Sequence, residues 1–336
     1  MRNLKHLAAL AAATGLLWAA LPAAPVEVGL GTLRIGGVLQ TVYGYAPYGG
    51  FDYRAWSFTE KRARIIFNGD LPEQKVKYLV QLEALQGAPL LDARIQACGW
   101  LPKTDIFIGQ FIPAVGHYMP RSTALLEMVN YPLLVTKYAM WRQVGAQTTT
   151  KLGPVDWNMG VFNGYPATNP FTAAKYDDPG KDVLISSSYK SLGFVQLFGY
   201  GWLGNAVEAR DVDARRNWFG GGAMAERKLG HGMLLILRGE AAAGEERRGM
   251  GGPLAKSGGH YLHMGLRPHP KIELLGRWDR FDTKRDDDGA AWYTGGVNYY
   301  FSGTNLMLYA NYVHKRLETN PPGNDDEFLV QAQLAF

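Results

Sequence analysis

Residues 328–336 have the sequence FLVQAQLAF, in which apolar and polar side chains alternate. Because successive side chains of a strand point to opposite faces, Phe328 and Phe336 share an apolar face. Gln331 and Gln333 lie on the other face. An apolar face that ends in an aromatic residue, opposite a mostly polar face, suits a strand between lipid and a wet lumen. An edge strand of a soluble β-sandwich alternates in the same way, so the decision depends on whether the pattern recurs.

The alternation does recur from residue 32 onward. In residues 62–68 the apolar Ile65 and Phe67 share one face, and the basic Arg62 and Arg64 share the other. We count sixteen such segments, joined alternately by short turns rich in Gly and Pro and by longer polar stretches. The longer polar stretches are residues 165–181, 204–215, 244–259, 283–289 and 317–326. Since short turns at one rim and long loops at the other are typical of outer-membrane barrels, the sequence predicts an all-β fold, a transmembrane antiparallel β-barrel of about 16 strands.

The composition agrees with such a barrel and excludes several other classes. The chain has 336 residues, among them 41 Gly, 18 Tyr and 9 Trp, and barrels carry aromatic girdles at both membrane interfaces. The formal net charge of +5 is small for this length and gives no support for a nucleic-acid partner. The single cysteine, Cys98, cannot form an internal disulfide and makes a metal site built on thiolates improbable. No later segment has about 18 consecutive apolar residues, so we expect no transmembrane helix.

Residues 1–23 have the organisation of a secretory signal peptide. Arg2 and Lys5 precede an apolar stretch, which is followed by small residues. The apolar part is shorter than the roughly 20 residues that a membrane-spanning helix needs. We therefore predict cleavage after Ala23, which leaves residues 24–336 as the barrel domain.

The alternation stops over residues 112–141. This segment mixes apolar residues with Arg121 and Lys137, for instance in the stretch PRSTALLEMVNYPLLV. Because sixteen strands close around a channel that wall side chains do not fill, we expect this third loop to fold into the lumen against the wall. The alternative is an outer loop that packs between subunits.

The inward faces of the predicted strands carry more basic than acidic residues. Arg62 and Arg64 share a face because they are two residues apart. Lys77 lies on the hairpin partner and Arg94 on the next strand, so the field of these cations should attract anions and raise their local concentration. The alternative is that lumen arginines pair with carboxylates and hold the wall in place. The inward basic residues are Arg34, Arg62, Arg64, Lys77, Arg94, Lys151, Lys190, Arg238 and Arg277, and the inward acidic residues are Glu83, Asp92, Asp156, Glu240, Glu273 and Asp279.

The sequence pattern does not indicate catalysis. Ser186 and Ser188 face inward, but no histidine can be placed beside them. His260 and His263 are three residues apart and therefore point to opposite faces of a strand. We predict that the protein is not an enzyme and that it has no catalytic residue, no metal and no cofactor.

A series of segments in a fixed order carries a family resemblance over residues 32–336. The segments are GGVLQTVYGY (36–45), RARIIFNGDL (62–71), KVKYLVQLE (75–83), LLDARI (90–95), IFIGQFIP (106–113), GVFNG (160–164), ELLGRWDRFD (273–282), GGVNYYFSGTNLMLYANYV (295–313) and the terminal phenylalanine. With these segments the chain resembles the phosphate-selective porin O and P family of Gram-negative outer membranes.

The resemblance implies a homotrimer of sixteen-stranded barrels, an inward third loop and passive uptake of anions such as phosphate or pyrophosphate. It also implies a ladder of arginine and lysine side chains that leads to a constriction. The positions that match this ladder are Arg62, Arg64, Arg121, Lys137 and Arg142.

We therefore predict an outer-membrane porin for passive diffusion of small solutes, with a preference for anions. The expected partners are small anionic solutes, outer-membrane lipid, lipopolysaccharide and other copies of the chain in a homotrimer, and nucleic acid is not expected. The alternative is a non-conducting outer-membrane barrel that acts as a receptor or scaffold. The predicted pore-lining and anion-binding residues are Arg34, Arg62, Arg64, Lys77, Arg94, Arg121, Lys137 and Arg142.

Overall fold

The structure is a computed structural model. It describes residues 26–29, 31–47, 54–85, 90–138, 140–164, 181–208, 211–247, 254–283, 289–318 and 323–336. The predicted signal peptide, residues 1–23, lies outside these residues, as does most of the predicted loop 165–181. Among the described residues, no helix is long and apolar enough to cross a membrane.

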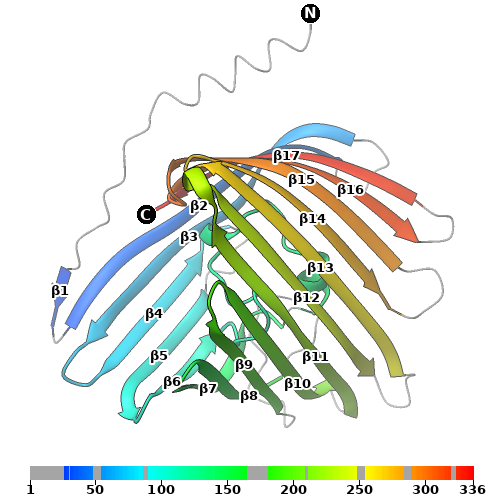
Figure 1. Cartoon of the computed structure of the whole chain (residues 1–336). Helices are drawn as coiled ribbons and strands as arrows, with labels where there is room; N and C mark the ends of the chain where they lie inside the picture. Colours follow the sequence, from blue (N-terminus) through cyan, green and yellow to red (C-terminus); the bar gives the residue numbers. More distant parts are fainter. Residues whose placement is uncertain are drawn as a thin grey trace, which may run out of the picture.

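Sixteen antiparallel strands, β2 to β17, form one closed barrel, so the predicted fold class is confirmed (Figure 1). Each strand pairs with its neighbours in sequence, and β17 closes the ring by pairing with β2, where Phe328 lies opposite Tyr45. The three-residue β1 pairs with the start of β2. The strands are β1 (Val26–Val28), β2 (Gly31–Pro47), β3 (Arg54–Leu71), β4 (Val76–Glu83), β5 (Leu90–Leu101), β6 (Thr104–Phe111), β7 (Gln143–Leu152), β8 (Val155–Phe162), β9 (Asp182–Leu192), β10 (Val195–Glu208), β11 (Asp211–Lys228), β12 (Leu234–Arg247), β13 (Leu254–His269), β14 (Ile272–Asp282), β15 (Gly289–Ser302), β16 (Leu306–Glu318) and β17 (Gly323–Ala335).

The strands alternate between an apolar outer face and a polar inner face. In β17, Phe328 is 43% exposed, whereas Gln331 and Gln333 on the opposite face are each only 1% exposed. Exposed aromatic residues lie beside the short turns (Trp100, Phe301) and toward the opposite end of the strands, as a pair of girdles would require. Large apolar residues on the outer face include Ile35, Leu39, Ile65, Ile95, Ile108, Met159, Ile185, Leu237, Leu262, Met264, Leu274 and Val297.

Three of the predicted long loops are wrong in length, because the strands continue into them. In the predicted loop 317–326, β16 continues to Glu318 and β17 begins at Gly323. The predicted loop 204–215 is mostly strand, since β10 ends at Glu208 and β11 begins at Asp211. Within the predicted loop 244–259, β12 continues to Arg247 and β13 begins at Leu254. Continued pairing satisfies backbone N–H and C=O groups that a loop would leave to water. Beside these predicted loops, Arg216 of β11 forms a cross-strand ion pair with Glu246 of β12, in which Nε and Oε1 are 3.9 Å apart.

The segment between β6 and β7 packs against the inner face of the barrel, where Figure 1 shows it in green inside the ring of strands. It contains the 3₁₀ helix η1 (Thr123–Leu125) and the helix α2 (Leu133–Tyr138), and a third short helix, η2 (Gly230–Gly232), lies in the turn between β11 and β12. We call residues 112–141 the inner segment. Its buried apolar side chains form the largest core of the molecule with residues of β8 to β14. The cluster includes Phe111, Val115, Tyr118, Met119, Leu133, Leu134, Met140, Phe162, Trp202, Trp218, Tyr261 and Phe281.

Candidate functional site

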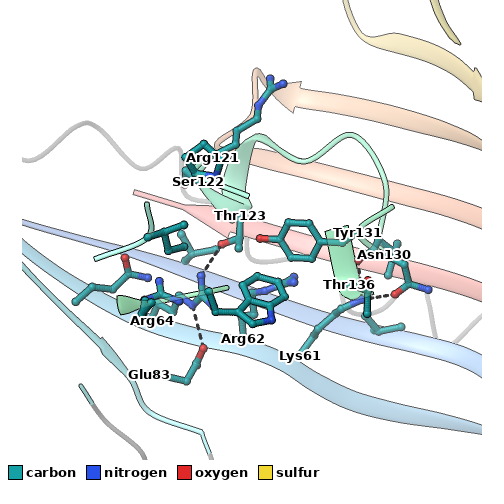
Figure 2. A pocket seen from close by; sticks show the side chains of 18 of the residues that line it. Lys61, Arg62, Arg64, Glu83, Arg121, Ser122, Thr123, Asn130, Tyr131 and Thr136 are labelled. Atoms are coloured by element: carbon teal, nitrogen blue, oxygen red, sulfur yellow. Dashed lines mark hydrogen bonds and ion pairs between the residues drawn. The ribbon is translucent and has the colours of Figure 1, made fainter. Parts of the chain in front are cut away.

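A cavity of about 840 Å³ lies between the inner segment and two groups of strands, β2 to β5 and β15 to β17. We call it the pore cavity. More basic than acidic side chains line it, and they come from both the strands and the inner segment (Figure 2). The basic lining residues are Lys61, Arg62, Arg64, Arg94, Arg121, Arg142 and Lys315, and the acidic ones are Glu83, Asp92 and Glu327.

A β-bulge in β3 turns two consecutive cations toward this cavity. Arg62 pairs with Gln40, but Glu60 pairs with Thr41, so Lys61 is an extra residue in β3. Such a bulge breaks the period of two, and Lys61 and Arg62 therefore both line the pore cavity. The alternation of side chains alone assigns Lys61 to the outer face. The available signal was the cost of a lysine facing lipid, which a bulge avoids.

Some of the cations in the cavity are neutralised by nearby carboxylates. Arg64 Nε lies 2.9 Å from Glu83 Oε2, and Arg64 Nη1 also donates to Thr123 Oγ1 at 3.1 Å (Figure 2). Arg142 donates through Nε and Nη2 to Asp92 Oδ2, at 3.0 and 2.8 Å. Arg64 thereby holds the inner segment at Thr123 and Arg142 holds the chain directly after it, which matches the alternative in which lumen arginines are structural.

Three other cations of the cavity differ from Arg64 and Arg142, because none of them forms an ion pair with a carboxylate of the described residues. They are Lys61, Arg62 and Arg94. Lys61 Nζ donates to the carbonyl oxygen of Val129 at 2.6 Å and to Asn130 Oδ1 at 2.7 Å. Arg62 Nη1 donates to Gln40 Oε1 at 2.5 Å. The Arg94 guanidinium lies 5.4 Å from the ring centroid of Phe107. All three of these direct partners are neutral, so no carboxylate of the described residues contacts Lys61, Arg62 or Arg94 directly. We call these three residues the free cations.

A second cavity, of about 260 Å³, continues the path toward the turn between β3 and β4. Arg34, Lys77 and Arg94 line it, and Arg94 also lines the pore cavity. Arg34 Nη1 is paired with Asp70 Oδ2 at 3.1 Å. The two cavities therefore form a sequence of cations from the inner segment to one rim of the barrel.

The structure places the eight predicted site residues in three groups. Five of them meet in the pore cavity, and Arg34 and Lys77 lie in the second cavity, which Arg94 shares. Lys137 is exposed at the end of α2 and is not among the residues that line either cavity. The five in the pore cavity are Arg62, Arg64, Arg94, Arg121 and Arg142.

The opposite wall, formed by β12 to β14, holds the inner segment by its backbone. Arg277 donates to the carbonyl oxygens of Asn130 and Tyr131, at 3.0 and 3.1 Å. Asp279 pairs with Arg277 Nε at 2.8 Å and accepts from the Leu133 N–H at 3.0 Å. Because each of these charged side chains binds the inner segment, we call Arg238, Glu240, Arg277 and Asp279 the anchoring wall.

Glu240 and Arg238 complete the anchoring wall. Glu240 Oε2 accepts from the His117 N–H at 3.2 Å and from the Tyr261 hydroxyl at 2.9 Å. Arg238 Nη1 lies 2.5 Å from Glu127 Oε1. Ser186 Oγ, on β9, donates to the carbonyl oxygen of Ala114 at 2.7 Å, so this inward serine is another anchor of the inner segment.

His117 is a neutral member of this contact region. Burial, then the positive charges of Arg238 and Arg121, lower the pKa of His117 to about 3. Arg121 Nη1 lies 2.9 Å from His117 Nε2. Since arginine can only donate, Nε2 accepts and the ring carries its proton on Nδ1. Among the described residues, no group of three or more His, Cys, Asp or Glu side chains is arranged to hold a metal ion.

No protein-family model matches the chain, and no curated protein matches it. Solved porin structures match it over almost its whole length. The anion-selective porin from Comamonas acidovorans is 14% identical with a TM-score of 0.66, covering 91% of this chain and 100% of that chain. The outer membrane channel DcaP of Acinetobacter baumannii is 14% identical with a TM-score of 0.65, covering 94% and 100%.

A third solved structure is the trimer form of OmpT, an outer membrane protein of Vibrio cholerae. It is 10% identical with a TM-score of 0.58, and the match covers 92% of this chain and 100% of that chain. These likenesses show the fold, which is the sixteen-stranded barrel of outer-membrane porins.

Proposed function

We propose that the protein is an outer-membrane channel for passive diffusion of small solutes and that it prefers anions, phosphate among them. The observation that carries this proposal is the set of free cations, Lys61, Arg62 and Arg94, on the wall of the pore cavity. An uncompensated positive field in a narrow, low-dielectric passage raises the local concentration of anions and repels cations. Guanidinium groups also suit phosphate oxygens, which they bind through paired N–H donors.

The outer face supports placement in the outer membrane of a Gram-negative bacterium. Its exposed residues are apolar along the middle of the strands, for example Ile95, Leu262 and Met264. The closed ring leaves no strand edge to be satisfied by water, which is the condition for crossing a lipid bilayer with strands. The solved structures with the same fold include the outer membrane channel DcaP and the outer membrane protein OmpT.

We also propose that the chain forms a homotrimer. The trimer form of OmpT from Vibrio cholerae, which has the same fold, supports this assembly. Light scattering of the purified protein, with the detergent contribution subtracted, should give three times the mass of one chain. The mass of one chain would contradict the trimer without affecting the channel.

Single-channel recording in a planar bilayer tests the anion preference. With a KCl gradient across the bilayer, the reversal potential should lie close to the chloride equilibrium potential. Phosphate added at constant chloride should then reduce the chloride current, because it competes for the free cations. A reversal potential near zero would mean that the channel does not discriminate between anions and cations. A reversal potential near the potassium equilibrium potential would contradict the proposal.

The alternative is a barrel with little conductance that serves as a receptor or scaffold. The observation that favours it is the extent of the inner segment, whose Tyr118, Leu133, Leu134 and Met140 are nearly fully buried within the barrel. In the same recordings, absence of current from a sample that shows heat-modifiable migration on a gel would support this alternative. Measurable current would exclude it.

A further inference from the structure

An aromatic surface lies beside the free cations in the pore cavity. Two aromatic residues of the inner segment line the cavity, Tyr131 and Trp141. Their ring centroids are 5.2 Å apart, with the planes at 74°. The Arg62 guanidinium lies 5.7 Å from the centroid of the Tyr131 ring, and Figure 2 shows this ring beside Arg62 and Lys61. Cations and aromatic faces therefore meet in one cavity.

The backbone of Trp141 indicates that the indole ring has a role there. Its φ angle is +42°, in the left-handed region that large side chains rarely adopt. Glycine or asparagine would form the same turn with less strain. The strained turn is held on its far side by the ion pair between Arg142 and Asp92, and Gln143 Nε2 donates to the Met140 carbonyl oxygen at 2.8 Å. Strain that the surrounding structure maintains at a cavity is typical of functional positions.

A small inorganic anion uses only half of this surface. Phosphate or chloride can bind the free cations, but neither gains from the rings of Tyr131 and Trp141 or from the apolar Ile66 and Leu79, which also line the cavity. A solute with a carboxylate and an aromatic ring uses both halves. Its carboxylate accepts charge-assisted hydrogen bonds from the cations, and its ring packs edge-to-face or offset on the aromatic pair.

We propose that the pore cavity selects aromatic carboxylates among small organic anions, with Tyr131 and Trp141 as the residues that recognise the ring. This inference rests on the proposed anion channel and names a solute class for it. The free cations supply the preference for negative charge. The aromatic pair supplies the preference for a flat ring over an aliphatic group of similar size.

The test compares benzoate with cyclohexanecarboxylate, which has the same charge and nearly the same size but no π-system. Reversal potentials are measured with chloride on one side of the bilayer and either carboxylate on the other. For the unaltered protein, benzoate should be about fivefold more permeant or more strongly blocking than cyclohexanecarboxylate, as expected for one aromatic contact. Tyr131→Leu should bring the ratio of benzoate to cyclohexanecarboxylate close to one, because the ring contact is lost. Tyr131→Phe keeps the ring and should preserve the ratio.

Trp141→Gly provides a second variant that removes the ring and relieves the backbone strain, so it should fold even where Tyr131→Leu does not. Tyr293→Leu is the matched control, because Tyr293 is 47% exposed on the outer face and should leave the ratio unchanged. Equal behaviour of benzoate and cyclohexanecarboxylate in the unaltered protein would overturn this inference. If chloride still sets the reversal potential in KCl, the anion channel stands. A cation-selective or silent protein would overturn both proposals together.

Discussion

The two sides of the barrel use the same residue type for different purposes. On the anchoring wall, Arg277 is bound to Asp279 and to two carbonyl oxygens of the inner segment. On the side of β3 and β5, Arg62 and Arg94 contact only neutral groups among the described residues. An arginine with a carboxylate partner stabilises the position of the inner segment. An arginine without one leaves its charge available to solutes.

The number of inward cations therefore does not by itself predict the ion selectivity of a pore. What matters is which cations lack a counter-ion, since a paired charge contributes little field at a distance. The contacts differ in kind: Arg277 has the carboxylate of Asp279 beside it, whereas the inner segment offers Lys61 only the neutral Val129 carbonyl oxygen and Asn130 Oδ1. Variants that remove a cation should therefore affect stability on one wall and ion selectivity on the other.

The largest expected effect is on the anchoring wall. Arg277→Met should lower the free energy of unfolding by about 3–5 kcal/mol, because Asp279 would keep a buried charge without a partner. Asp279 is 0% exposed, so water cannot replace the arginine. The matched variant Arg62→Met removes a cation that has no carboxylate partner and should cost about 1 kcal/mol, the value of its hydrogen bond to Gln40. Denaturant unfolding in lipid vesicles, followed by tryptophan fluorescence, measures the free energy of unfolding of both variants. Equal decreases for the two variants would contradict the comparison between the two sides of the barrel.

The next largest expected effect on stability comes from a substitution of Gly116, where the inner segment meets the anchoring wall. Gly116 has a φ of +66°, and a Cβ there would lie 2.3 Å from Glu240 Oε1. Gly116→Ala should therefore lower the free energy of unfolding by about 2 kcal/mol. Gly153→Ala is the control, since Gly153 has a φ of +60° and a Cβ would meet nothing within 4 Å. The same unfolding experiment should show a smaller loss for the control, and equal losses would mean that only the backbone conformation matters.

On the side of the free cations the expected effect is on selectivity. Arg62→Gln should lower the permeability ratio of chloride to potassium about fivefold, which corresponds to about 1 kcal/mol, the interaction of two unit charges at about 4 Å in water. The change should grow at low ionic strength, where screening is weaker. The control is the double variant Lys190→Gln/Asp156→Asn, which removes an ion pair at 2.6 Å that does not line the pore cavity. Reversal potentials that shift as much in the control would contradict a local role of Arg62.

The smallest expected effect concerns pH at the anchoring contact. The folded protein holds the pKa of His117 at about 3, below its ordinary value, so the unfolded chain binds a proton that the folded chain does not. Stability is therefore unaffected well above the ordinary histidine pKa and falls as the pH decreases through it. From about pH 7 to about pH 6 the loss should be about 0.7 kcal/mol. His117→Gln should lack this part of the pH dependence, and identical pH profiles would show that His117 has its ordinary pKa in the folded state.

Much of the barrel and part of the candidate site follow from the sequence. The alternation of apolar and polar residues placed Arg62, Arg64 and Arg94 on the inner face, where they line the pore cavity. It missed Lys61, because a bulge changes the face of a residue without any change in composition. The strand lengths were underestimated, because polar residues near the ends of strands have the same composition as a loop until their cross-strand partners are known.

The sequence by itself determined the barrel, because a period of two is a local property that recurs in sixteen segments and because short and long connections alternate between them, which is typical of outer-membrane barrels. It also determined that cations would be in excess on the inner face. Only the tertiary structure decided which of them are free. Arg277 meets Asn130, and Arg142 meets Asp92, through contacts between residues far apart in the chain. Charge compensation depends on those distances, and the path of the inner segment through the barrel sets them.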